Sequence, residues 1–126
     1  MPILTTSALL LAAALPGQCN EYQRPNFTPA EVKCVIRRVF PDHLEDEAIA
    51  VANCESRLNP LVTNRSGAAG VFQFMPDTWR RKWNPYRRKS PYNVVVNVKA
   101  AKVLYHTRTY PGGPMYGWTP WSCSPY

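Results

Sequence analysis

The chain has 126 residues and carries 15 Lys and Arg against eight Asp and Glu, a formal net charge of +7. This length allows one domain with a modest core and excludes a chain of several domains. The positive charge favours polyanionic partners such as nucleic acid, acidic lipid or a charged bacterial wall, without choosing among them. The four cysteines and two histidines are not spaced like zinc ligands, so we expect no metal and no other cofactor.

The N-terminal segment differs from the rest of the chain. Residues 3–15 are apolar and uncharged, and Pro16-Gly17 follows them. This pattern predicts a secretory signal peptide at residues 1–17, and therefore a secreted protein. The cysteines all follow this segment, and their even number is typical of a small oxidised domain. They are Cys19, Cys34, Cys54 and Cys123, which leaves three disulfide pairings open.

Residues 18–41 are predicted to form an N-terminal extension with one capped helix. Thr28 is the expected N-cap, Pro29 takes the first helical position, and Glu31 completes a capping box. The apolar spacing of the helix continues to Phe40.

A second helix is predicted from residue 43 or 44 to residue 57 or 58. Asn59-Pro60 ends it, because the residue before a proline avoids helical geometry. The residues that share one face of this helix are Leu44, Ala48, Val51, Ala52 and Glu55. A carboxyl group on an apolar face tends to keep its proton toward neutral pH, as a general acid must. Glu55 is therefore the candidate acid, and the alternative is a buried ion pair with Arg57 or Arg65.

The rest of the chain is predicted to contain one long helix among irregular segments. Residues 61–75 should form turns with a short hairpin, and a brief basic helix begins at Pro76. Residues 84–92 form a loop, and the longest helix covers 93–107, with its first asparagine as the N-cap. The tail at 110–126 is rich in Gly, Pro and Trp. These elements predict a mainly α, single compact domain.

Two motifs at a defined separation resemble the transglycosylase SLT domain family. The first is Cys54-Glu55-Ser56-Arg57-Leu58-Asn59-Pro60, and the second runs from Ser66 to Trp79 and contains Gly70-Val71-Phe72-Gln73. The ending Trp118-x-x-Trp121-x-Cys123 is similar to that of secreted members. The family is the lysozyme-like group of soluble lytic transglycosylases, goose-type lysozymes and, more distantly, resuscitation-promoting factors. The resemblance implies a lysozyme-like α+β domain at residues 42–126, mainly helical, with a disulfide-pinned tail.

The resemblance implies cleavage of the β-1,4 bond between N-acetylmuramic acid and N-acetylglucosamine in peptidoglycan. Glu55 would protonate the glycosidic oxygen and then take a proton from the C6 hydroxyl, giving a 1,6-anhydro product. The alternative is a hydrolytic muramidase, which ordinarily needs a second acid, and Asp77 is the candidate for it. The expected partner is the glycan strand of the wall, and the expected enzyme is a monomer, either cellular or phage-encoded.

The resemblance also implies residues that bind the substrate. Ser56 matches a position near the acid, and Gln73 matches one that faces the N-acetyl or hydroxyl groups of the sugar. The alternative for both is capping and hydrogen bonding within the loop. The family's Ala-Tyr-Asn-x-Gly motif, which supplies an aromatic side chain to the cleft, has no counterpart after the last helix. The candidates for this sugar-facing wall are Phe72, Tyr105, Tyr116 and Trp118.

The family architecture implies how the cysteines pair. Cys54 would bridge to Cys123 and pin the Trp-rich tail beside Glu55, which leaves Cys19 to pair with Cys34. In the chain-entropy model, the disulfide that closes the longer loop lowers the entropy of the unfolded chain and so stabilises the folded state by about 4 kcal/mol.

The run from Trp79 to Lys89 suggests a rival function, because basic residues alternate there with aromatic ones. Such a run suits single-stranded nucleic acid, or adhesion to an anionic wall by a module without catalysis. The predicted signal peptide and disulfides argue against nucleic acid, and the presence of Glu55 argues against an inactive module. We therefore expect no nucleic-acid partner and an anionic cell wall surface as the environment.

Overall fold

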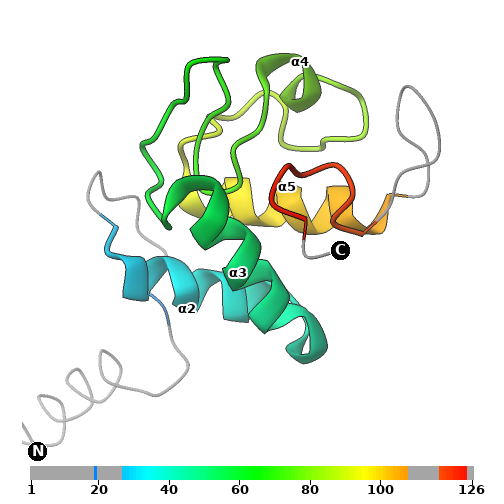
Figure 1. Ribbon diagram of the computed structural model, residues 1–126. Helices are drawn as coiled ribbons and strands as arrows, with labels where there is room; N and C mark the ends of the chain where they lie inside the picture. The colour runs from blue at the N-terminus through cyan, green and yellow to red at the C-terminus, as the bar shows by residue number, and fades with distance from the viewer. Residues whose placement is uncertain (1–18, 20–26, 108–116, 125–126) are drawn as a thin grey trace, which may run out of the picture.

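The computed structural model describes residue 19, residues 27–107 and residues 117–124 (Figure 1). Its helices are α2 (Pro29–Val39), the 3-10 helix η1 (Asp42–Leu44), α3 (Glu45–Ser56), α4 (Pro76–Trp79) and α5 (Val94–His106). The described residues hold no β-strand and only isolated antiparallel bridges, which join Ala69 to Thr63 and to Phe74. The mainly α class is therefore confirmed, and the expected hairpin is reduced to these bridges. The predicted signal peptide and Tyr116 lie outside the described residues.

Helix α2 begins as its sequence predicts. The side chain of Thr28 accepts a hydrogen bond of 3.2 Å from the backbone N–H of Glu31, and Pro29 occupies the first turn. The buried face of α2 consists of Val32, Val35 and Ile36. This face packs against α3 and α5, so the N-terminal extension shares one core with the rest of the described chain.

Helix α3 ends earlier than Asn59-Pro60 would require. Its last residue is Ser56, because Arg57 and Leu58 both take left-handed backbone angles, with φ of 55° and 60°. Left-handed geometry costs a residue with a Cβ atom about 1 kcal/mol or more, so two in a row need support from their surroundings. The side chain of Leu58 supplies part of it, since it is buried in the core. The two left-handed residues turn the chain away from the helix axis one residue after Glu55.

Helix α5 crosses the molecule behind α3, and the irregular segment with α4 lies on the far side of it from α2 (Figure 1). Asn93 caps α5 by accepting a hydrogen bond of 3.0 Å from the backbone N–H of Val96. Aromatic rings join the core to the C-terminal segment: Phe72 stacks on Trp118 with ring centroids 6.1 Å apart, and Trp118 meets Trp121 at 5.1 Å.

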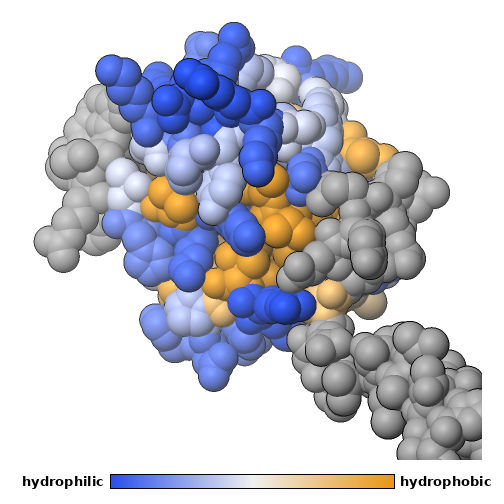
Figure 2. All heavy atoms as spheres, turned by 180° about the vertical axis from the view of Figure 1, so that it is seen from behind, coloured by the Kyte–Doolittle hydropathy of each residue, from blue (hydrophilic) through white to orange (hydrophobic). Residues whose placement is uncertain are grey.

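The surface is divided between apolar and polar regions. Viewed from behind, hydrophobic side chains gather in the middle of the face, with hydrophilic residues above and below (Figure 2). Within the described ranges, none of the helices has the length and apolar composition that crossing a bilayer requires.

Candidate active site

Glu55 lies in the last turn of α3, half-buried beside the C-terminal segment. Its Oε2 accepts a hydrogen bond of 3.1 Å from the backbone N–H of Cys123, and the backbone N–H of Ser122 also donates to the carboxyl group. Cys54, the residue before Glu55, is bonded to Cys123 through a disulfide, with Cα atoms 6.0 Å apart. The end of α3 and the C-terminal segment are thus joined by a disulfide and by hydrogen bonds to the carboxyl group of Glu55.

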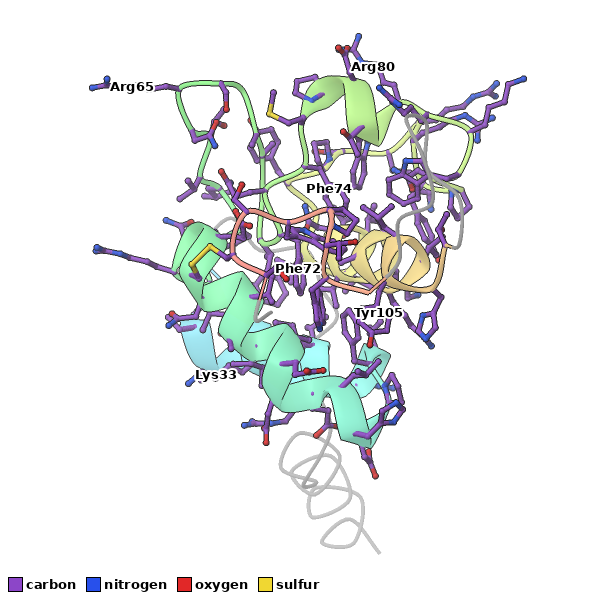
Figure 3. All side chains as sticks on the ribbon, turned by 45° about the vertical axis from the view of Figure 1, so that its right-hand side comes forward. Lys33, Arg65, Phe72, Phe74, Arg80 and Tyr105 are labelled. Atoms are coloured by element: carbon purple, nitrogen blue, oxygen red, sulfur yellow. A yellow bond between two sulfur atoms is a disulfide. The ribbon has the colours of Figure 1, made fainter. Side chains whose placement is uncertain are left out.

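Burial is the main influence on the protonation of Glu55. It raises the pKa of this carboxyl group above its usual value, and the two backbone N–H donors at Ser122 and Cys123 offset only part of that rise. Among the described residues, no ion pair involves Glu55. Arg57 is exposed, and Arg65 points away from the body of the molecule (Figure 3). The alternative of a buried ion pair is therefore not found in the described structure.

The loop that carries the Gly-Val-Phe-Gln motif is tied directly to the helix of the acid. The hydroxyl of Ser56 lies 2.7 Å from the carbonyl oxygen of Val71 and 3.1 Å from that of Ala52, and it is buried. Its single proton is shared between these two acceptors. Ser56 therefore holds the motif loop against the last turn of α3, one residue from Glu55.

Asn97 on α5 anchors the other side of the same loop. Its side chain is fully buried, and its Oδ1 accepts a hydrogen bond of 2.8 Å from the backbone N–H of Phe72. Its Nδ2 donates to the carbonyl oxygen of Pro91 at 2.8 Å and lies 3.4 Å from that of Ala69. The role of Asn97 was not predicted from the sequence. The signal was an asparagine inside the apolar spacing of the longest helix, the same kind of anomaly that singled out Glu55.

Gly70 allows this close approach of loop and helix. Its φ is +81°, and a Cβ atom at this position would lie 2.3 Å from the carbonyl oxygen of Pro91 and 2.5 Å from Nδ2 of Asn97. Only glycine fits such a site without moving backbone. The motif glycine is thus explained by contact with the residues that hold the loop.

A comparison with family models matches residues 40–118 to the transglycosylase SLT domain. The matched segment covers more than half of the chain and contains Glu55 and the motif loop. The chain belongs to the transglycosylase SLT domain family. No curated protein and no solved structure matches it in the corresponding searches. Membership of this family gives the chain a glycan-cleaving role of the lytic transglycosylase and lysozyme kind, with peptidoglycan as the substrate on which the family acts.

The SLT motif glutamine makes its contacts within the protein. Gln73 takes a left-handed conformation, with φ of 51°, and its side chain is buried. Its Nε2 donates to the carbonyl oxygens of Val62, at 3.0 Å, and Gly70, at 2.9 Å. The amide nitrogen therefore braces the loop, while the contact of this residue with a sugar stays a prediction.

The aromatic candidates for the sugar-facing wall of this SLT domain lie in or near the core. The side chains of Phe72 and Trp118 are fully buried, and Phe72 lies in the middle of the molecule (Figure 3). Tyr105 is half-buried and meets Trp118 edge to face at 4.9 Å. The indole Nε1 of Trp121 donates to the carbonyl oxygen of Phe72 at 3.0 Å, which adds a third fastening of the motif loop. In this conformation these rings support the site from behind, and their contact with substrate stays a prediction.

Both disulfides implied by the SLT resemblance are present. Cys19 pairs with Cys34, with Cα atoms 5.6 Å apart, and Cys54 pairs with Cys123.

Asp77 lies on α4, where its side chain is 90% exposed and sits 3.9 Å from Arg80. In the described part of the chain, no three His, Cys, Asp or Glu side chains gather in a way that could hold a metal ion.

Proposed function

We propose that the protein is a lytic transglycosylase that cleaves the β-1,4 bond between N-acetylmuramic acid and N-acetylglucosamine, with Glu55 as its single acid and base. The observation that carries the proposal is the environment of Glu55. Burial favours its protonated form, while the backbone N–H groups of Ser122 and Cys123 favour the ionised form. A group that must give up a proton and then recover one needs both forms within reach.

The reaction then proceeds in two steps on one carboxyl group. Glu55 donates its proton to the glycosidic oxygen, the bond from C1 to that oxygen breaks, and positive charge develops on the sugar ring. The C6 hydroxyl oxygen attacks C1 and its proton returns to Glu55, so water is not consumed and the product is a 1,6-anhydro sugar. Because the N–H of Cys123 can only donate, it stabilises the negative charge of Glu55 between the two steps.

The exposed surroundings of Asp77 support this route rather than hydrolysis. An inverting or retaining hydrolase ordinarily places a second carboxyl group about 5 to 9.5 Å from the acid. The carboxylate of Asp77 is almost fully exposed on α4 beside Arg80, as a surface acid at a helix start would be. This environment supports a single-carboxylate mechanism.

The test compares two variants that each remove one carboxylate. Glu55→Gln should lower the rate of release from dye-labelled peptidoglycan by about 10²- to 10⁴-fold, the usual contribution of a general acid and base. Asp77→Asn should keep the rate of the unaltered protein. Full activity of Glu55→Gln would overturn the proposal, and loss of activity in Asp77→Asn would favour the hydrolytic route. Action outside the cell is part of the same proposal, because the substrate lies there, and so are secretion and a monomeric state.

A further inference from the structure

A surface distinct from the acid concentrates the positive charge of the molecule. Residues 76–92 contain six of the 15 Lys and Arg and a single acidic residue, Asp77. Six positive charges less one negative charge give +5 of the chain's net +7. We call these six side chains the basic surface: Arg80, Arg81, Lys82, Arg87, Arg88 and Lys89. The end of the molecule that carries α4 is covered by hydrophilic residues (Figure 2), and Arg80 points outward there (Figure 3).

The backbone beneath the basic surface is held by side chains that point inward. Nε1 of Trp79 donates to the carbonyl oxygen of Lys89 at 3.0 Å, and Nε1 of Trp83 donates to that of Thr78 at 3.0 Å. Asn84 is fully buried and its Nδ2 donates to the carbonyl oxygen of Trp79 at 2.9 Å. These bonds fix the loop, so binding through its cations needs little further ordering of the backbone.

A hollow of about 360 Å³ opens among the cations. Its charged lining consists of Arg80, Arg87, Arg88 and Lys89, and its apolar lining includes Phe74, Trp79 and Pro91. Glu55 is not part of this lining. Four like charges around one hollow repel one another, and an anion bound there relieves the repulsion. The ion pair of Arg80 with Asp77 is long, at 3.9 Å, and largely exposed, so it neutralises little of this charge.

Three of the four aromatic side chains in this stretch are buried or half-buried. Trp79 is buried, Trp83 and Tyr86 are half-buried, and both indole N–H groups are bonded within the protein. Tyr92 is exposed, but its hydroxyl is hydrogen-bonded to Thr63. Binding of single-stranded nucleic acid relies on rings that are open to stack with bases. Tyr92 also lines the hollow and is the one exposed ring of this stretch. The stretch therefore surrounds the hollow with four cations but offers a single ring for stacking, which favours a phosphodiester chain that carries no bases over single-stranded nucleic acid.

We propose that the basic surface binds the anionic phosphodiester polymer attached to bacterial walls, of the teichoic acid type. This site holds the protein on the wall independently of the cleavage of the glycan at Glu55. The binding does not need the proposed catalytic mechanism, so either can fail without the other.

The test measures binding to purified walls that carry teichoic acid, before and after hydrofluoric acid has removed the phosphodiester polymer. All binding is measured in the Glu55→Gln background, so that the walls stay intact. The test variant is Arg87→Gln/Arg88→Gln/Lys89→Gln. The matched control is Arg37→Gln/Arg65→Gln/Lys102→Gln, which removes the same number of positive charges, all on exposed side chains, from α2, the 61–75 loop and α5. A single-stranded oligonucleotide forms a third arm.

Binding to intact walls should weaken steeply with salt for the control and much less for the test variant. In nucleic-acid binding each lost phosphate contact flattens the slope of log K against log salt by about 0.7 to 0.9, so three contacts should flatten it by about 2 to 3. Removal of the polymer should abolish the difference between the two variants. With Glu55 intact, the test variant should still cleave polymer-free peptidoglycan. Equal binding of intact walls by the two variants would overturn the proposal. So would binding of the control variant to stripped walls as tightly as to intact walls, or tighter binding of the oligonucleotide than of intact walls.

Discussion

The backbone N–H of Cys123 reaches Oε2 of Glu55 at 3.1 Å, although 68 residues separate them in the sequence. The disulfide between Cys54 and Cys123 holds the two segments at the same place. The tail therefore does two things to one carboxyl group: it removes water from around it, and it supplies donors to its ionised form. Burial prevails, so the pKa of Glu55 is raised.

The activity should decline as the pH rises through the raised pKa of Glu55. Only the protonated carboxyl group can donate a proton to the glycosidic oxygen, so ionisation removes the general acid. The alkaline limb of kcat/KM reports this pKa in the free enzyme. Initial rates on soluble glycan strands over a range of pH should place the limb above the ordinary range of a glutamate. A limb within that ordinary range would contradict the raised pKa.

The raised pKa of Glu55 should also make the folding stability depend on pH, and Glu55→Gln should remove this dependence. The folded state holds the Glu55 proton more tightly than the unfolded state, so stability falls as the pH rises from the usual pKa of 4.5 to the raised value. A glutamine at this position does not ionise, so it loses no stability as the pH rises. The free energy of unfolding of Glu55→Gln, relative to the unaltered protein, should therefore increase across this window and level off above it. Asp77→Asn, on the exposed surface, serves as the control, and a difference that does not vary with pH would contradict the prediction.

Loss of the Cys54–Cys123 disulfide should reduce both stability and activity. The two cysteines are 69 residues apart, and the chain-entropy model gives about 4 kcal/mol for a loop of this size. Cys54→Ser/Cys123→Ser should also lose activity in its folded fraction, because the tail no longer holds its N–H groups on Glu55. Urea unfolding and rates at a temperature where the variant is folded measure the two effects.

The matched control for this variant is Cys19→Ser/Cys34→Ser, which opens the loop with a separation of 15 residues. It should lose about 3 kcal/mol of stability and keep the specific activity of its folded fraction. Equal loss of activity in both double variants would show that the tail has no special role at Glu55.

Gly70→Ala should destabilise the protein far more than Gly67→Ala. A Cβ atom on Gly70 meets the carbonyl oxygen of Pro91 at 2.3 Å and Asn97 at 2.5 Å, in addition to the strain of a positive φ. We expect a loss of about 3 kcal/mol or more from overpacking and strain together. Gly67 also has a positive φ, but its nearest contact is the side chain of Pro76 at 3.5 Å, so strain alone should cost about 1 kcal/mol. Thermal unfolding of the two variants distinguishes these cases, and equal losses would contradict the close packing of the loop.

The features that could be predicted from the sequence are those with a local cause. The cap at Thr28, the start of α5 at Asn93 and the apolar setting of Glu55 follow from residue type and helical spacing within a few positions. The two short motifs identified the family because the motif residues themselves are few and closely spaced. The early end of α3 could not be predicted, since left-handed angles at Arg57 and Leu58 have no signal in their side chains and depend on how the core receives Leu58.

The fastening of the motif loop is the part of the site that the sequence did not reveal. Asn97 reaches Phe72 across 25 residues, and Trp121 reaches Phe72 across 49. Such contacts exist only once the helices have packed, so no local pattern encodes them. The same packing buries Phe72 and Trp118, which the sequence alone could equally have placed on a surface that faces the sugar.

The most direct measurement is mass spectrometry of the fragments released from purified peptidoglycan by the unaltered protein and by Glu55→Gln. We expect 1,6-anhydro ends from the unaltered protein and no release above background from the variant. Undiminished release by Glu55→Gln would contradict the role of Glu55, and reducing ends in place of anhydro ends would contradict the transglycosylase reaction.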